Sequence, residues 1–264
     1  MNKIFDGKKE SLKVKEDLKN RLKKNLNIGI IQLGDDANSN IFIRQKINFA
    51  KDIGVNVNLS KFPEGYKDLG NIIDEFNKDK ELSAYIIQLP LLGYKNLNIL
   101  NNINENKDID CLNKINYAKV LVGEYSFAPG VFRAFLYILN QTDISKDMNI
   151  LIIGGGFVGR LIANYLISNN YNVTVLDKYS KDISLYLGIC DVIILATGLK
   201  EQIKKEQIKK DSYIINIGAS SDFEGNIISG IEDDCIDKTK FFVPLKGGIG
   251  PMTVAMLFYN LLFL

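Results

Sequence analysis

Ile150-Leu-Ile-Ile-Gly-Gly-Gly-Phe-Val-Gly159 is the stretch that decides the fold of this chain. Its apolar residues predict a buried strand that ends in a glycine-rich turn, and an amphipathic helix is expected from Phe157 to about Asn169. Strand, turn and helix follow one another in the order that a Rossmann-type dinucleotide site requires, with the spacing Gly154-x-Gly156-x-x-Gly159. A lone pattern of this kind is weak evidence, but its context here is the expected one.

The glycine pattern also predicts how a nucleotide would be held. Gly154 and Gly156 allow a tight turn close to a pyrophosphate, and Gly159 allows the helix to pack closely on the strand. The helix N-terminus offers free amides and partial positive charge to phosphates. Asp177, at the end of the next strand, can accept hydrogen bonds from a ribose; the alternative is a glycine-rich turn with an incidental aspartate.

Alternating strand and helix patterns extend in both directions from this stretch. Expected strands are residues 28–33, 55–59, 84–89, 149–153, 172–176, 191–196 and 213–217. Expected helices are residues 8–25, 39–53 and 131–140. The alternation predicts an α/β protein with two α/β domains, each with a parallel sheet covered by helices. We expect one domain over residues 1–122 and a Rossmann-like domain over 123–250. The helix of residues 251–264 should pack back on the first domain, and a cleft is expected between the two domains.

Composition excludes several classes of chemistry. The 264 residues contain no histidine, so acid–base catalysis must depend on Lys, Asp, Glu, Tyr or Cys. The cysteines Cys111, Cys190 and Cys235 are far apart and show no metal-ligand spacing, so no metal site is expected. The 33 Lys and Arg residues nearly balance 31 Asp and Glu residues, which predicts neither nucleic acid nor a membrane as a partner.

The location of the protein is predicted from its ends and its cysteines. The N-terminus is charged from Lys3 onward and has no signal-peptide core. The apolar segment Val254–Leu264 is shorter than the about 20 residues that cross a bilayer. With free cysteines, these features predict a cytoplasmic protein.

A second glycine-rich run, Val243-Pro-Leu-Lys-Gly-Gly-Ile-Gly-Pro-Met-Thr253, precedes the last apolar segment. Its glycines let a ligand approach the main chain, and Pro251 suits the first turn of a helix. The run resembles the signature Thr-Pro-Val-Pro-Gly-Gly-Val-Gly-Pro-Met-Thr of methylenetetrahydrofolate dehydrogenase/cyclohydrolases. Ser39-Asn-Ile-Phe-Ile-Arg-Gln-Lys46 resembles a second pattern of that family, Ser-x-x-Tyr-x-x-x-Lys. On these blocks the chain is identified as a divergent member.

The resemblance assigns roles in binding tetrahydrofolate derivatives and in catalysis. Lys46 matches the catalytic lysine, and Phe42 keeps the aromatic ring that packs on the folate but lacks the tyrosine hydroxyl. Gln88, in Gln88-Leu-Pro-Leu91, corresponds to the glutamine that orients the lysine. Asp110, in Lys107-Asp-Ile-Asp110, corresponds to an aspartate that hydrogen-bonds the pterin, although a turn residue is its alternative reading.

Other positions are carried over more loosely. Phe5-Asp-Gly-Lys8, Ala196-Thr-Gly198 and Ile215-Asn-Ile-Gly218 resemble further family motifs. The resemblance also assigns substrate contacts to Gly247, Gly248 and Pro251. It assigns cofactor contacts to Gly154, Gly155, Gly156, Gly159, Asp177, Lys178, Ala219 and Thr253.

The expected cofactor is NAD or NADP, with NAD favoured. The family loop reads Gly-Arg-Ser-x-x-Val-Gly, whereas here Gly155 and Gly156 stand where Arg and Ser are expected. The loop therefore lacks the Arg that would bind a 2′-phosphate, and Asp177 would repel one. Lys178, next to Asp177, is the counter-argument, because it could pair with that phosphate.

The resemblance implies oxidation of 5,10-methylenetetrahydrofolate to the methenyl form. It also implies hydrolysis of that form to 10-formyltetrahydrofolate, with a partly desolvated Lys46 moving protons. The absent hydroxyl at Phe42 makes the hydrolase half the weaker expectation. A homodimer is expected by family analogy. Two alternatives remain at this point: a Rossmann dehydrogenase for another small substrate, and a dinucleotide-binding regulator without catalysis.

Overall fold

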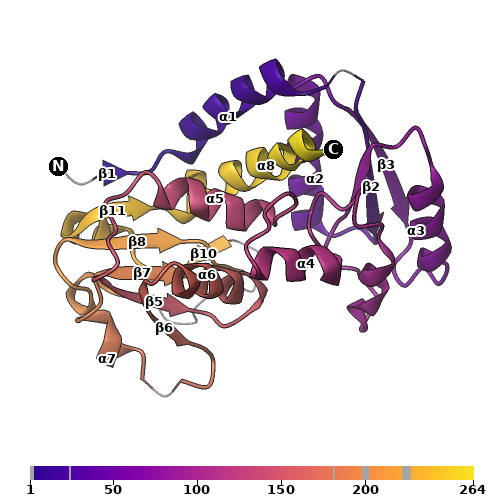
Figure 1. The fold of residues 1–264 in the computed structure, drawn as a ribbon. Helices are drawn as coiled ribbons and strands as arrows, with labels where there is room; N and C mark the ends of the chain where they lie inside the picture. The colour runs from indigo at the N-terminus through magenta and orange to yellow at the C-terminus, as the bar shows by residue number, and fades with distance from the viewer. Residues whose placement is uncertain (1–2, 24, 181, 198–201, 222–226) are drawn as a thin grey trace. The chain divides into compact units, whose positions relative to one another are not determined.

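Parallel strands and helices alternate along the chain in this computed structural model, which describes residues 3–23, 25–180, 182–197, 202–221 and 227–264 (Figure 1). The chain separates into two compact units. One contains residues 1–10 and 131–253, and the other contains residues 11–130 and 254–264. Both are α/β units with parallel sheets, as predicted.

The unit of residues 11–130 and 254–264 is built on a three-stranded parallel sheet. The central strand β2 (Asn27–Leu33) pairs with β3 (Asn56–Phe62) on one side and β4 (Ala84–Ile87) on the other. The other elements with residues in this unit are α1 (Gly7–Arg21), α2 (Ala37–Asp52), α3 (Leu69–Lys78), η1 (Leu97–Asn102), α4 (Lys114–Leu121), α8 (Gly250–Tyr259) and η5 (Asn260–Phe263).

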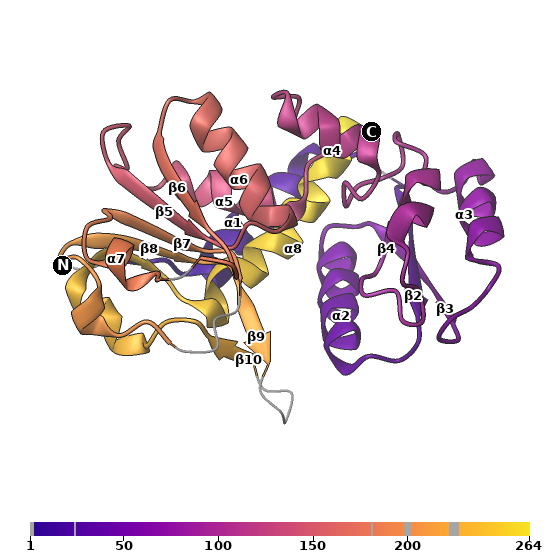
Figure 2. The same ribbon diagram turned by 90° about the horizontal axis from the view of Figure 1, so that it is seen from below.

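Burial explains why this small sheet is stable. Figure 2 shows α2 and α3 on opposite faces of it. Leu69 and Ile73 of α3 are fully buried against Ile31 and Leu33 of β2. β3 is an edge strand with much of its surface exposed, which agrees with the alternating pattern expected for residues 55–59.

The unit of residues 1–10 and 131–253 contains a six-stranded parallel sheet in the order β1-β11-β8-β7-β5-β6. Its strands are β1 (Lys3–Ile4), β5 (Asn149–Ile153), β6 (Asn172–Leu176), β7 (Val192–Leu195), β8 (Ser212–Asn216) and β11 (Thr239–Val243). Its further elements are α5 (Gly130–Leu139), α6 (Phe157–Ser168), α7 (Ser184–Leu187), η2 (Lys205–Gln207), η3 (Asp233–Lys238), η4 (Leu245–Ile249) and the antiparallel pair β9 (Ala219–Ser221) and β10 (Ile227–Ser229).

The strand order creates a topological switch point at β5. β5 lies between β6 and β7, so the chain runs to opposite sides of β5 after successive strands. In an open parallel sheet, ligands bind outside the carboxyl ends of the strands at such a switch point. The Gly154–Gly159 turn directly follows β5 at this end.

The division of the chain differs from the boundaries expected from sequence. Residues 1–10 fall in the same unit as 131–253, whereas the expected first domain began at residue 1. The reason is strand pairing: Lys3 and Ile4 pair with Phe241 and Phe242 of β11, and the Phe5 amide donates to the Phe242 carbonyl at 2.9 Å. Such a long-range pairing leaves no periodic signal in a two-residue strand.

Candidate active site

Helix α2 places Lys46 on its buried face. Asp36 caps the helix by accepting a 2.7 Å hydrogen bond from the Ser39 amide, so the helix begins at Ala37, two residues before the start expected from the sequence. Lys46 lies on the same buried side as Ile43 and Phe49, and only 8% of its surface is exposed. A lysine at such a depth needs polar partners, because an unpaired buried ammonium group is costly.

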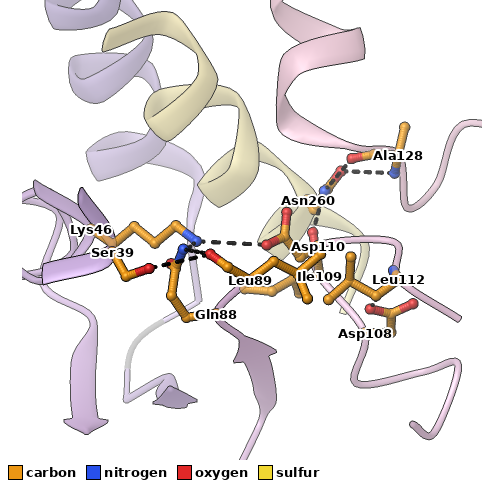
Figure 3. Close-up of polar contacts among 10 residues, drawn as sticks. All are labelled: Ser39, Lys46, Gln88, Leu89, Asp108, Ile109, Asp110, Leu112, Ala128 and Asn260. Carbon is orange, nitrogen blue, oxygen red and sulfur yellow. Dashed lines mark hydrogen bonds and ion pairs between the residues drawn. The ribbon is translucent and has the colours of Figure 1, made fainter. Parts of the chain in front are cut away.

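Two side chains from other segments supply these partners (Figure 3). The Lys46 ammonium donates a 3.0 Å hydrogen bond to Oε1 of Gln88, which immediately follows β4. Its nitrogen lies 3.6 Å from Oδ2 of Asp110. The structure therefore brings together the three residues that the resemblance assigns to catalysis and pterin binding, from three separate parts of the sequence.

Gln88 is itself oriented by the main chain. Its Nε2 donates to the Leu89 carbonyl at 2.7 Å, so Oε1 is the atom that remains to accept from Lys46. Ser39 adds a longer contact, with its hydroxyl donating to the same carbonyl at 3.4 Å. Ser39 thus links the first turn of α2 to the segment that carries Gln88.

Asp108 supports the loop that carries Asp110, and sequence reasoning did not assign it a role. It accepts hydrogen bonds from the amides of Leu112 (3.0 Å) and Asn113 (2.8 Å) and from the side chain of Asn116 (3.1 Å). Its surface is 1% exposed. The only sequence signal for it was its place in the Lys107-Asp-Ile-Asp110 motif, where either aspartate could have been the structural one.

Burial raises the pKa of the Asp108 carboxyl to about 6, and the nearby charge of Asp110 adds to the effect. The hydrogen bonds from Leu112, Asn113 and Asn116 oppose this shift, because they stabilise the carboxylate. Above pH 6 the ionised group therefore holds the loop as a triple acceptor.

Phe42 lies one helical turn before Lys46 on α2, and 40% of its surface is exposed. An aromatic ring that exposed has a face available for contact with another flat ring. The position agrees with the expected packing on folate, which stays a prediction.

The glycine turn after β5 is shaped by close backbone approaches. Gly154 has φ +120°, and a Cβ there would lie 2.9 Å from the Ala196 carbonyl carbon. A Cβ at Gly159 would lie 1.8 Å from the Gly154 oxygen. Neither position accepts a side chain, so the glycines allow the loops after β5 and β7 to meet.

The start of α6 is open to an anion. Gly156 is the N-cap and, among the described residues, no side chain caps the helix there and no atom lies within 4 Å of where a Cβ at Gly156 would be. The first amides of a helix lack partners within the helix and bind phosphates well. The predicted pyrophosphate position is therefore sterically accessible.

Asp177 lies beside this turn, as expected. A Cβ at Gly155 would be 3.6 Å from the Cβ of Asp177. Asp177 is exposed, and one of its oxygens accepts from the Tyr179 amide at 2.8 Å. The Lys178 nitrogen lies 5.0 Å from the centre of the Tyr179 ring, in a cation–π contact. Both charges are thus present at the edge of the turn.

The second glycine-rich run forms η4 and the start of α8. Gly247 has φ +76°. Gly7 packs closely on the Gly248 carbonyl, so a Cβ on Gly7 would lie 1.7 Å from the Gly248 oxygen. Thr253 donates its hydroxyl to the Ile249 carbonyl at 3.0 Å, and Pro251 is half-buried in the first turn of α8. The loosely matched motif Phe5–Lys8 and the second glycine run are thereby in contact.

Two other expected positions have less structural support. Ala219 begins β9 and pairs with Ser229 of β10. The motif Ala196-Thr-Gly198 follows β7, and its Gly198 lies outside the described residues.

Among the residues that the structure describes, no group of three or more Cys, Asp or Glu side chains is arranged to hold a metal ion. No helix in this part of the chain is long and apolar enough to cross a membrane.

The fold and the two clusters define an α/β protein with a dinucleotide-type glycine turn and a buried lysine site. Comparison with known families matches residues 5–110 to "Tetrahydrofolate dehydrogenase/cyclohydrolase, catalytic domain". Residues 129–264 match "Tetrahydrofolate dehydrogenase/cyclohydrolase, NAD(P)-binding domain". The chain belongs to the tetrahydrofolate dehydrogenase/cyclohydrolase family, and the predicted family is confirmed.

Individual relatives agree over nearly the whole chain. It is 36% identical to "Bifunctional protein FolD" of Borreliella afzelii over 280 residues, covering 98% of this chain and 92% of that protein. It is 30% identical to the protein of the same name from Hydrogenobaculum sp., covering 98% and 97%. The crystal structure of the bifunctional FolD methylenetetrahydrofolate dehydrogenase/cyclohydrolase from Campylobacter jejuni superposes with a TM-score of 0.91 at 26% identity, covering 99% and 98%. The predicted fold class is confirmed.

Proposed function

We propose that this protein oxidises 5,10-methylenetetrahydrofolate to 5,10-methenyltetrahydrofolate and hydrolyses the product to 10-formyltetrahydrofolate. The observation that carries the proposal is the buried Lys46–Gln88–Asp110 cluster in a chain that matches both domains of the family. A regulator without catalysis would have no need of a desolvated lysine held by two polar partners.

Lys46 moves protons in this proposal. During hydrolysis, water that attacks the one-carbon unit must lose a proton, and the folate nitrogen whose bond to that carbon breaks must take one up. Gln88 fixes the direction of the Lys46 ammonium through its 3.0 Å contact, and burial excludes bulk water from around it. No histidine competes for the role, because the chain contains none.

Asp110 and Phe42 hold the folate. The Asp110 carboxylate is a charged acceptor for the N–H groups of a pterin edge, and its side chain is 26% exposed, so a ligand can reach it. The exposed ring of Phe42, one turn from Lys46, packs on the flat part of the substrate.

The glycine turn fits a nicotinamide dinucleotide. The N-terminus of α6 has open space at Gly156 for a pyrophosphate, and the Asp177 carboxylate lies beside Gly155 for a ribose. A bound cofactor would supply the acceptor for the hydride that leaves the one-carbon unit of the folate. The task of the chain's own residues in that step is positioning.

Two assays of the purified protein test this function. With methylenetetrahydrofolate and NAD or NADP, we expect reduced nicotinamide to form together with the methenyl product. With methenyltetrahydrofolate alone, we expect hydrolysis faster than in buffer. Absence of both reactions under conditions where the cofactor binds would contradict the proposal.

We also propose that NAD is preferred over NADP. The turn has Gly155 where an Arg could hold a 2′-phosphate, and Asp177 adjoins it, so the phosphate would meet like charge. Comparing kcat/KM for both cofactors in wild type and in Asp177→Ser tests this. The substitution should shift the preference toward NADP. If the wild type already favours NADP, the proposal is wrong, and Lys178 or another cation binds the 2′-phosphate.

We further propose that the protein is a homodimer. Its partners in this proposal are tetrahydrofolate derivatives, and neither nucleic acid nor a membrane is among them. The support for this proposal is family analogy and the near-neutral net charge of +2. Light scattering of the purified protein measures the oligomeric state directly, and a monomer at micromolar concentration would contradict the dimer.

A further inference from the structure

Asn260 is a buried polar residue close to the loop of Asp110, although it lies near the other end of the sequence. It begins η5, directly after α8, and has no exposed surface. Its Nδ2 donates to the Ile109 carbonyl at 2.6 Å and to the Ala128 carbonyl at 2.8 Å. Its Oδ1 accepts from the Ala128 amide at 3.4 Å. Figure 3 shows this side chain between the two segments.

Ile109, whose carbonyl accepts from Asn260, directly precedes Asp110 in the chain. On the other side of Asp110, the amides of Leu112 and Asn113 are held by the Asp108 carboxylate. Between them, Cys111 has the left-handed φ of +57°, which is uncommon for a residue with a side chain. The backbone that carries Asp110 is therefore held on both sides by buried polar side chains.

The direction of the Asp110 side chain depends on this backbone. The carboxylate is 26% exposed and lies 3.6 Å from the Lys46 nitrogen, which is longer than a direct hydrogen bond. That long contact is a weak restraint, so the loop conformation decides where the carboxylate points.

We propose that Asn260 is a positioning residue that holds the Asp110 loop for folate recognition, so that the C-terminal segment sets the geometry of the substrate site. The inference rests on the proposed role of Asp110 in binding the folate. Asn260 does not contact the substrate; it acts through the Ile109 carbonyl.

The amide side chain is suited to this position for a chemical reason. It offers two N–H donors, which match the carbonyls of Ile109 and Ala128, and one oxygen, which matches the Ala128 amide. A serine would supply one donor, and an ionised aspartate none. An aspartate would also place its charge against two carbonyl oxygens.

The test uses the full chain with Asn260→Ser. We expect kcat/KM for methylenetetrahydrofolate to fall about 10- to 100-fold, mainly through KM, because small displacements of a binding group are this costly. The cofactor affinity, measured by titration, should remain unchanged. Asn260→Thr keeps nearly the same side-chain volume, adds no charge and supplies only one donor, so it is the second variant if the serine chain does not fold.

Asn77→Ser is the matched control. Asn77 also bonds the main chain of this unit, at the Asn102 carbonyl and the Asn104 amide, and its side chain makes no hydrogen bond to Ile109 or Ala128. Loss of its hydrogen bonds should lower stability without raising the folate KM. An equal rise in KM would make Asn260 a merely structural residue.

A double-mutant cycle with Asp110→Ala tests the route of the effect. In the Asp110→Ala background, Asn260→Ser should change the folate KM by less than roughly twofold, because residues that act through one another are not additive. Fully additive effects of the two substitutions would overturn the inference about Asn260. A wild-type KM in both Asn260 variants, with a raised KM in Asp110→Ala, would also overturn it and would leave the proposed role of Asp110 standing. A wild-type KM in Asp110→Ala would contradict the proposed role of Asp110 itself, and the inference with it.

Discussion

Lys46 shows how a single residue acquires chemistry from its surroundings. On the outer face of α2 it would be one lysine among many, but here its stem is buried and its ammonium group has two polar partners, Gln88 and Asp110. Its partners and its burial together fix the direction of the ammonium group. The ammonium group of an exposed lysine would instead move freely in solvent.

We expect Lys46→Met to abolish methenyltetrahydrofolate hydrolysis while leaving dinucleotide binding intact, since the variant keeps the apolar stem and loses the acid–base group. The decay of methenyl absorbance measures the rate, and a cofactor titration measures binding. Lys51→Met, on an exposed position of the same helix, is the control and should keep full activity. Hydrolysis at the wild-type rate in Lys46→Met would remove this residue from the mechanism.

Asp108 predicts a pH-dependent contribution to stability. Its pKa is raised from 3.8 to about 6 in the folded protein, so between these values the folded chain binds a proton that the unfolded chain has lost. The stabilisation from this group is therefore complete below about pH 4 and is lost as the pH rises through about 6, amounting to at most about 3 kcal/mol.

Denaturant unfolding of wild type and Asp108→Asn at pH 4 and pH 6 measures this effect. We expect the difference between their free energies of unfolding to change in favour of the variant as the pH rises. Asp74→Asn, an exposed position on α3, should retain the wild-type pH dependence. Equal pH dependence in wild type and Asp108→Asn would show that the carboxyl titrates alike in both states.

At the scale of elements, the start of α1 and the turn η4 depend on each other. Gly7 is the first residue of α1, and its Cα hydrogen faces the Gly248 carbonyl, where any Cβ would overlap the oxygen at 1.7 Å. The positive φ of Gly247 bends the chain into this contact. The two glycine-containing motifs are thus the two halves of one packed contact.

Gly7→Ala should destabilise the protein by about 1–3 kcal/mol, because the turn must shift to admit a methyl group. The control is Gly250→Ala, where a Cβ has open space and the backbone is helical, so stability should be kept or slightly raised. Thermal unfolding of both variants measures the difference. Equal melting temperatures for Gly7→Ala and wild type would show that η4 can shift to admit the methyl group without loss of stability.

At the scale of the whole molecule, the N-terminal strand belongs to the sheet formed much later in the chain. Phe5 is 3% exposed, and its ring centre lies 6.3 Å from that of Phe241. The chain order therefore interleaves the two units: residues 1–10 lie with 131–253, and residues 254–264 lie with 11–130.

Phe5→Ala should lower the free energy of unfolding by about 3–5 kcal/mol, as other buried phenylalanines do. Hydrogen exchange should then accelerate in β11, its partner strand, and remain slow in β2, which is nearer in sequence but lies in the other unit. Leu12→Ala, at an exposed position of α1, is the control for a change near the N-terminus. Faster exchange in β2 instead of β11 would contradict this division.

Much of the local structure could be predicted from the sequence. The strands β5 and β6 match their expected bounds, and α6 ends one residue before the expected Asn169. Periodicity and glycine spacing are local signals, so they survive without tertiary information. The triplet of Lys46, Gln88 and Asp110 came from family resemblance, since spacing alone cannot bring three distant residues together.

The sequence by itself determined the α/β class, the glycine turn after β5 and the absence of histidine from any mechanism. Only the tertiary structure decided that Lys3–Ile4 joins β11, that Asp108 supports the loop of Asp110, and that Asn260 holds that loop from the C-terminal segment. The physical reason is range. Strand registers and buried side-chain hydrogen bonds join residues far apart in the chain, and each such residue taken alone has no pattern that distinguishes it from a surface or turn position.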